Sequence, residues 1–161
     1  MWEEYLLYEK IFFKDRRGKE QAFRWIPFAV LLIADRAAKS LAAFYLAEAT
    51  VKEKTRFLSL ALHYNQGISF SLLKNFPSVS LTASVLGIVI LGALCFKNIS
   101  LRSSTAVLFL WAGAIGNLTD RLLYGYIIDW LYVGIYINLA DIWLCAGCLM
   151  IVSLHTKTLW S

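Results

Sequence analysis

The sequence predicts an all-α integral membrane protein with four transmembrane helices. Hydrophobic residues make up 59% of the 161 residues and charged residues only 17%, and the mean hydropathy is +0.60. Soluble domains run near 45–50% apolar and about 25% charged, so the composition excludes a soluble domain, a disordered chain and a disulfide scaffold. Four apolar stretches also approach the roughly 20 residues that a helix needs to cross a bilayer.

The four predicted spans are, in order, Trp25–Ala49, Phe76–Phe96, Thr105–Tyr124 and Leu139–His155. The only two prolines, Pro27 and Pro77, stand at the start of the first two spans. A proline costs little in a first helical turn, because the N–H groups there have no internal acceptor. Asn138 directly precedes the fourth span and is a suitable N-cap residue.

Lysine and arginine near the span ends predict that both chain termini are cytoplasmic. Nine cations fall on the predicted cytoplasmic side: Lys10, Lys14, Arg16, Arg17, Lys19, Arg24, Lys97, Arg102 and Lys157. Five fall on the other side: Lys52, Lys54, Arg56, Lys74 and Arg121. The net charge of +5 is too diluted by apolar sequence to indicate a nucleic-acid partner.

Residues 1–24 are predicted to be a cytoplasmic extension and residues 25–161 a four-helix membrane domain. Glu3 and Glu4 stand where a secretory signal peptide carries positive charge, so no cleavable signal peptide is expected. Apolar residues among charges in this extension suit an amphipathic helix on the cytoplasmic leaflet. A loosely ordered extension is the alternative.

The acidic residues gather at one end of the predicted bundle. After Glu53 the chain has only Asp120, Asp129 and Asp141, all within 22 residues. Ionisable groups at membrane depth are expensive and indicate function by default. Asp129 lies in an apolar, strand-like run with no residue three or four positions away to neutralise it, although a solvated loop aspartate remains the alternative. Asp141 is expected in the first turn of a capped helix, which leaves a capping role and a chemical role both open.

The third span carries small and polar residues along one face. Helical spacing stacks Gly113, Gly116 with Asn117, and Asp120 with Arg121. Small residues allow close approach of a helix or a ligand, Asn117 offers two donors and an acceptor, and Arg121 offers a planar fork of donors. Helix packing with an interfacial ion pair is the alternative.

Asp35 and Lys39 are spaced for an i,i+4 ion pair inside the first span, and mutual neutralisation favours a structural role for them. No partner for Arg36 follows from the sequence. Two other classes of protein also stay open at this point. One is a small transporter with Asp35 as a proton relay, and the other is a scaffold subunit whose polar residues only pack helices.

The loop before the second span predicts an extended stretch over Thr55–Asn65 that runs into a glycine turn, where Asn65 and Gly67 could meet a ligand. His63 is expected to be an interfacial histidine without a chemical role. Cys145 and Cys148 lie inside a helix without a second ligand pair, so helix packing is favoured over a metal or redox site.

The pair of carboxylates formed by Asp129 and Asp141 indicates acid–base catalysis. Twelve residues separate Asp129 from Asp141, and a loop-to-helix return of that length can bring both to one point at the non-cytoplasmic surface. Two adjacent carboxyl groups share a proton. The charged one can then deprotonate water while the protonated one polarises a peptide carbonyl, as in aspartic proteases.

These motifs together resemble the bacterial lipoprotein signal peptidases, or type II signal peptidases. The resemblance rests on five blocks in order: Asp35-x-x-x-Lys39, residues 65–71 (NQGISFS), residues 112–121 (AGAIGNLTDR), residues 125–130 (GYIIDW) and Asn138-Leu139-Ala140-Asp141. It covers the chain from about residue 25 onward. Arg36 is a departure, because the family usually has glutamine there.

The resemblance implies an aspartyl endopeptidase of the bacterial inner membrane with four transmembrane helices and a small extracytoplasmic β-cradle. Its substrates would be prolipoproteins, cut just before a diacylglyceryl-modified cysteine. Asp129 and Asp141 would be catalytic. Substrate-binding residues would be Asn65, Asn117, Arg121 and Asn138, and supporting residues would be Asp35, Lys39, Gly67 and Asp120. The resemblance further implies no metal or cofactor, inhibition by the cyclic peptide globomycin, contact with membrane lipids, and action as a monomer.

Overall fold

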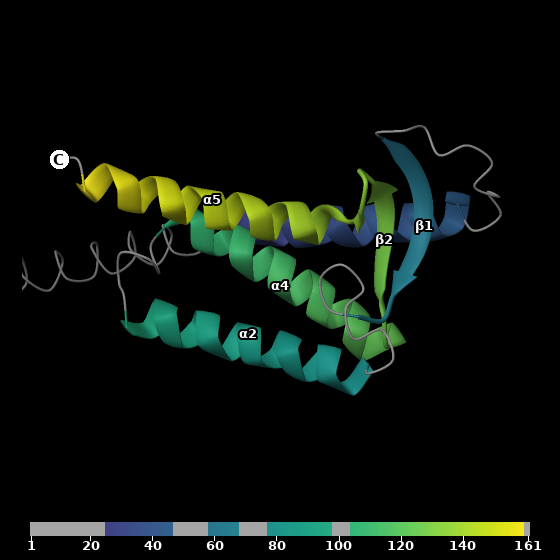
Figure 1. Cartoon of the computed structure of the whole chain (residues 1–161), viewed down its shortest axis with the longest axis horizontal. Helices are drawn as coiled ribbons and strands as arrows, with labels where there is room; N and C mark the ends of the chain where they lie inside the picture. The colour runs from purple at the N-terminus through teal and green to yellow at the C-terminus, as the bar shows by residue number, and fades with distance from the viewer. Residues whose placement is uncertain (1–24, 47–57, 68–76, 98–103, 160–161) are drawn as a thin grey trace, which may run out of the picture.

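A computed structural model describes residues 25–46, 58–67, 77–97 and 104–159. The described chain is mostly helical, with a three-stranded sheet placed across one end of the helices (Figure 1). The predictions for residues 1–24 and the predicted span residues 47–49 and 76 lie outside the described residues. Within the described part, all four predicted spans are helical.

The helix boundaries follow the sequence signals closely. Residues 25–46 are helical, α2 is Pro77–Lys97, α4 is Thr105–Tyr124 and α5 is Leu139–Leu159. The helix α5 continues four residues beyond the predicted end at His155. The end of α4 is fixed by Gly125, whose φ of 78° allows its N–H to donate to the Arg121 carbonyl oxygen at 3.0 Å.

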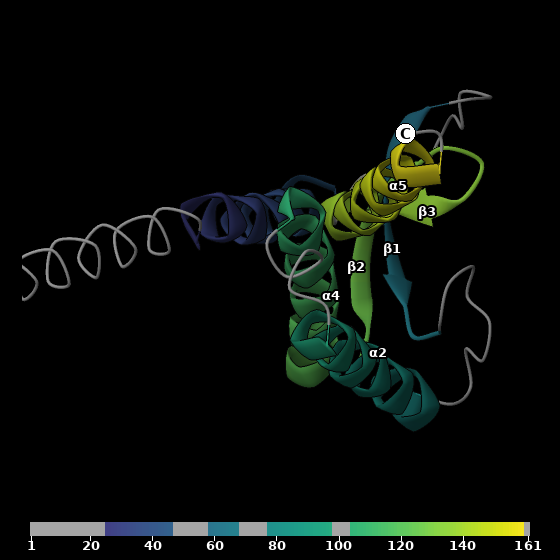
Figure 2. The same cartoon turned by 90° about the vertical axis from the view of Figure 1, so that its left-hand side faces the viewer.

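The helix α4 lies centrally and is packed against both α2 and α5 (Figure 2). The approach to α5 and to the helix over residues 25–46 depends on small residues. A Cβ atom added to Gly113 would lie 2.4 Å from the Ala140 carbonyl oxygen, and one added to Gly116 would lie 2.8 Å from Asp35 Oδ2. The predicted small-residue face of the third span is therefore a helix-packing face.

The outer surfaces of the helices are apolar. Phe44 is 77% exposed and Phe96 is 84% exposed, and other large apolar side chains on the same helices are also open to the surroundings. Among the described residues, Ser78–Lys97 and Thr105–Tyr124 are long and apolar enough to cross a membrane, and Leu139–Ser153 is a shorter apolar helix. Such a surface is suited to lipid and unsuited to water.

The sheet consists of β1 (Ser59–Asn65), β2 (Ile127–Tyr132) and β3 (Tyr136–Ile137), in that spatial order. Both pairings are antiparallel, and the β1–β2 register places Asn65 opposite Ile127 and His63 opposite Asp129. The register shifts between Leu60 and His63. The predicted extended stretch is confirmed from Ser59 to Asn65.

Candidate active site

Asp129 and Asp141 meet at one asparagine. The side-chain Nδ2 of Asn138 donates to Asp129 Oδ1 at 2.6 Å, and the backbone N–H of Asn138 donates to Asp141 Oδ2 at 3.1 Å. Asp129 is 1% exposed and Asn138 is fully buried. The strand β2 and the first turn of α5 thus bring together two acids that are separated by twelve positions in the sequence.

The geometry around Asp141 is a reciprocal helix cap. Asn138 Oδ1 accepts a hydrogen bond from the Asp141 N–H at 3.1 Å, while Asp141 Oδ2 accepts from the Asn138 N–H. The predicted N-cap role of Asn138 is confirmed, and the cap fixes the Asp141 carboxylate in the first turn of α5. Asn117 Nδ2 from α4 donates to the other oxygen, Asp141 Oδ1, at 2.8 Å.

Asp129 receives its second hydrogen bond from the end of β1. Asn65 Nδ2 donates to Asp129 Oδ2 at 3.1 Å, while Asn65 Oδ1 accepts from the Gly67 N–H at 3.0 Å. The Gly67 carbonyl oxygen in turn accepts from a guanidinium nitrogen of Arg121 at 2.9 Å. The turn predicted to present Asn65 and Gly67 therefore lies directly beside the carboxylate pair.

A cluster of two acids and two cations is linked to the carboxylate pair through Asn117; three of its members are buried, and the side chain of Arg36 is 34% exposed. Lys39 Nζ lies 2.8 Å from Asp35 Oδ2 and 2.8 Å from Asp120 Oδ2, and it donates to Asn117 Oδ1 at 3.1 Å. Arg36 forms an ion pair with Asp120 Oδ1. Two negative and two positive groups balance one another, which makes the cluster tolerable in apolar surroundings.

The cluster also touches the backbone of both elements that carry the catalytic candidates. Asp35 Oδ1 accepts from the Ala140 N–H at 2.9 Å, one residue before Asp141. Asp120 Oδ2 accepts from the Ile128 N–H at 3.3 Å, one residue before Asp129. The predicted Asp35–Lys39 pair is confirmed, and Asp35 is occupied by these partners.

The pKa of Asp129 is raised from 3.8 to about 7, chiefly by burial and in second place by the nearby negative charge of Asp141. Hydrogen bonds from Asn138 and Asn65 and the positive charge of Lys39 act in the opposite direction, because they stabilise the ionised form. Asp129 can therefore exchange a proton near neutral pH.

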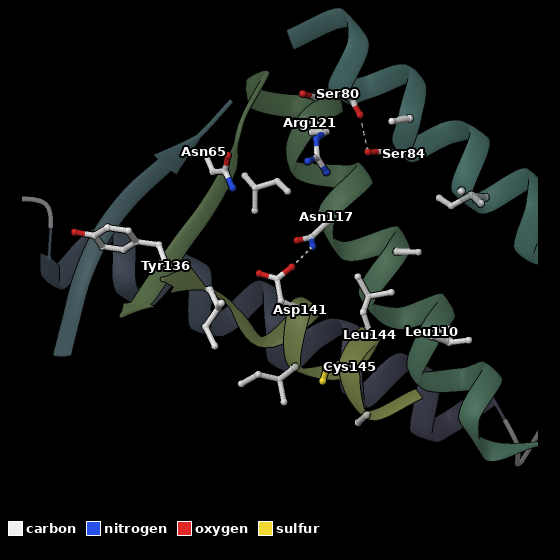
Figure 3. Close-up of a pocket in the computed structure, with 18 of the residues that line it drawn as sticks. Asn65, Ser80, Ser84, Leu110, Asn117, Arg121, Tyr136, Asp141, Leu144 and Cys145 are labelled. Carbon is white, nitrogen blue, oxygen red and sulfur yellow. Dashed lines mark hydrogen bonds between the residues drawn. The ribbon is translucent and has the colours of Figure 1, made fainter. Parts of the chain in front are cut away.

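A cavity of about 980 Å³ opens beside the carboxylates between α2, α4 and α5. Its polar end is formed by four of the predicted site residues: Asn65, Asn117, Arg121 and Asp141. Figure 3 shows Asn117 bonded to Asp141 within this end, with Leu110, Leu144 and Cys145 farther along the cavity. Asp129 and Asn138 do not line it, so Asn138 lies against the carboxylates and not against the cavity.

The structure corrects the prediction for the two cysteines of α5 and gives the partners of His63 and Arg36. Cys145 and Cys148 are free and exposed on α5, so the expectation that they pack between helices is wrong. The ring of His63 stacks on Tyr136 with centroids 4.5 Å apart. Arg36, for which no partner follows from the sequence, forms its ion pair with Asp120. An arginine in an apolar span requires a carboxylate, and Asp120 was an acid available in another span.

Comparison with known proteins adds independent evidence. A family profile described as signal peptidase (SPase) II matches residues 27–156. The lipoprotein signal peptidase of Francisella tularensis subsp. novicida is 35% identical over 153 residues, covering 83% of this chain and 93% of that protein. The lipoprotein signal peptidase of Fusobacterium nucleatum subsp. nucleatum is 31% identical over 139 residues, covering 80% and 82%.

The fold is shared with solved structures. Two structures described as bacterial membrane enzymes, studied by the in meso method, align with TM-scores of 0.66 and 0.62 at 22% and 23% identity. The first alignment covers 85% of this chain and 90% of the other, and the second covers 84% and 94%. Taken with the family profile, which spans most of the sequence, these findings show that the chain is a membrane protease of the signal peptidase II family.

Proposed function

We propose that this chain removes the signal peptide from prolipoproteins by cutting just before a diacylglyceryl-modified cysteine, with Asp129 and Asp141 as the catalytic pair. One observation carries the aspartyl mechanism: Asn138 hydrogen-bonds both carboxylates beside the polar end of an apolar cavity. A peptide bond and a lipid group from the same substrate could be held together there.

In this proposal the two carboxyl groups share one proton. The ionised carboxylate takes a proton from water as the water oxygen attacks the carbonyl carbon, and the protonated carboxyl gives its proton to the carbonyl oxygen. When the resulting gem-diol collapses, the C–N bond breaks and the leaving amine takes up the proton that came from water. A hydroxyl of the gem-diol gives its proton to the other carboxylate, so the pair again holds one proton. The pKa of Asp129 near 7 supports such an exchange at neutral pH.

The polar residues of the cavity supply substrate contacts in this scheme. The Nε atom of Arg121 is buried without a hydrogen-bond partner among the described residues, so it is available to a substrate carbonyl. Asn65 and Asn117 lie at the same end. The apolar remainder of the cavity, which includes Ile88, Leu91 and Leu149, suits acyl chains.

We also propose that the protein crosses the bacterial inner membrane four times as a monomer, with both termini cytoplasmic and residues 1–24 forming a cytoplasmic extension. The membrane peptidase domain would be residues 25–161. The sheet, the end of α4 and the start of α5 gather at one end of the helices, which supports a site at the extracytoplasmic surface (Figure 1). Bound lipids and globomycin as an inhibitor belong to the same proposal.

The test uses purified full-length protein in proteoliposomes and a precursor whose cysteine carries diacylglyceryl. Asp129→Asn and Asp141→Asn should each lower the cleavage rate at least about 100-fold, the scale of a lost general acid or base. Cys148→Ser is the control, because Cys148 is exposed and does not line the cavity. Heat-unfolding curves of each variant in detergent check that the fold is retained.

Near-normal cleavage by either aspartate variant would refute the catalytic assignment. The same precursor without its diacylglyceryl group should be cut far more slowly. Equal cleavage of both precursors would refute the lipid part of the proposal.

A further inference from the structure

The turn that carries Asn65 is held from two helices. Arg121 of α4 donates to the Gly67 carbonyl oxygen at 2.9 Å. Ser80 of α2 donates its hydroxyl hydrogen to the Gln66 carbonyl oxygen at 3.0 Å. Figure 3 shows Ser80 and Arg121 near the same end of the cavity. The carbonyl groups of two successive residues, Gln66 and Gly67, are thus anchored to α2 and to α4, respectively.

The Ser80 hydroxyl behaves differently from its neighbours on the same helix. Thr82 donates to the Ser78 carbonyl oxygen and Ser84 donates to the Ser80 carbonyl oxygen, both at 2.9 Å and both within α2. Ser80 reaches instead to a residue fourteen positions earlier. Its side chain is 1% exposed, so its hydroxyl has exchanged water for this one partner.

A short path joins this hydroxyl to the carboxylate pair. Gln66 lies between Asn65 and Gly67, and Gly67 donates its N–H to Asn65 Oδ1. That bond orients the amide of Asn65, so that Asn65 Nδ2 points at Asp129 Oδ2. Releasing the Gln66 carbonyl would therefore loosen the asparagine that holds Asp129.

We infer that Ser80 is a positioning residue for the cleavage reaction: its hydroxyl anchors the Asn65–Gly67 turn to α2 and so keeps the Asn65 amide aimed at Asp129. This inference rests on the proposed function. Ser80 also lines the cavity, so the anchor lies beside the space that the proposed substrate would occupy. Ser80 itself touches no reacting atom in this scheme.

Two isosteric variants separate the hydroxyl from the volume of the side chain. Ser80→Val and Ser80→Thr add the same bulk, but only threonine keeps the hydroxyl. Ser80→Val should lower kcat about tenfold with a smaller change in KM, and Ser80→Thr should recover most of the loss. Thr82→Val is the matched control, since Thr82 is exposed and bonds only within α2. Its kcat should equal that of the unchanged protein.

The pH dependence of kcat/KM distinguishes loss of the hydrogen bond from Asn65 to Asp129 from a simple loss of packing, because poorer packing alone would not shift the pKa of Asp129. The hydrogen bond from Asn65 lowers the pKa of Asp129. Because Asp129 has the raised pKa, it holds the shared proton, and its ionisation sets the basic limb of kcat/KM. In Ser80→Val this limb should therefore shift to higher pH, and in Ser80→Thr it should return. A second check is Asn65→Ala, in whose background Ser80→Val should have little further effect on kcat.

Several results would overturn the inference. An unchanged kcat and pH profile in Ser80→Val would do so, and so would equal losses in the valine and threonine variants, which would implicate volume. If the valine variant fails to fold, Ser80→Ala replaces it under the same criteria. Because the unchanged protein is assayed in parallel, its failure to cut the diacylated precursor would count against the proposed function. A normal rate with no Ser80 effect would count only against this inference.

Discussion

Gly113 is the position where α4 and α5 approach most closely among the glycines of the described chain. A Cβ atom there would lie 2.4 Å from the Ala140 carbonyl oxygen and 2.7 Å from Leu144 Cγ. Ordinary contacts begin about 1 Å farther out. The oxygen belongs to the backbone of the first turn of α5, so it cannot move aside without moving that turn.

Gly113→Ala should therefore be destabilising although alanine favours helices. Overpacking of this kind costs about 1–3 kcal/mol, with the upper end expected for a backbone clash. The gain in helix propensity offsets at most about 1 kcal/mol. We expect a net loss of about 2 kcal/mol in the free energy of unfolding. Asp141 directly follows Ala140, and a misplacement of about 1 Å at a reacting group can cost roughly 100-fold in rate.

Gly92→Ala is the control, because its added Cβ would meet only the ring of Trp111, at ordinary distances of 3.7 Å to Cη2 and 4.0 Å to Cζ2. Unfolding by denaturant in detergent micelles gives the stability of both variants, and cleavage of the diacylated precursor gives the rate. If Gly113→Ala matches Gly92→Ala in both measurements, the packing argument and the placement of Asp141 by α5 are wrong.

Two further predictions concern charge. The pKa of Asp129 is raised from 3.8 to about 7, so the folded state keeps a proton that the unfolded state has lost between these values. The contribution of Asp129 to the free energy of unfolding should then decrease as pH rises from about 4 to about 7, and it should stay level above pH 7. The measurement is denaturant unfolding at a series of pH values for the unchanged protein and for Asp129→Asn, and the difference between the two gives the contribution of Asp129. Arg36→Met removes one partner of Asp120 but leaves Lys39, and should cost about 1.5 kcal/mol in the same unfolding assay, with Arg36→Lys recovering part. No loss in Arg36→Met would contradict the charge-balance argument.

The helices could be predicted from the sequence because their signals are local. Thr105–Tyr124 begins and ends as expected, since an apolar run of spanning length stops at Gly125. Asn138 likewise predicts the start of α5, because the side chain of an N-cap residue accepts a hydrogen bond from the backbone N–H three positions later, here that of Asp141. Such interactions depend on spacing that one sequence displays directly.

The contacts that complete the site could not be predicted in the same way. The Arg36–Asp120 pair joins residues 84 positions apart, and the register of β1 on β2 depends on a shift between Leu60 and His63. Ser80 carried no signal at all, since a serine in an apolar helix usually bonds its own helix, as Ser84 does. Long-range pairing depends on how helices approach, and one sequence without its fold does not specify that.

The cap of α5 shows why a structural role and a chemical role need not be alternatives for one residue. Asn138 uses its backbone N–H and its Oδ1 for the reciprocal cap with Asp141, and neither of these hydrogen bonds involves Nδ2. That remaining donor binds Asp129 at 2.6 Å. A helix terminus thereby sets the position of one carboxylate relative to the other. Because the cap forms whenever α5 forms, the pair would be assembled by folding itself, before any substrate arrives.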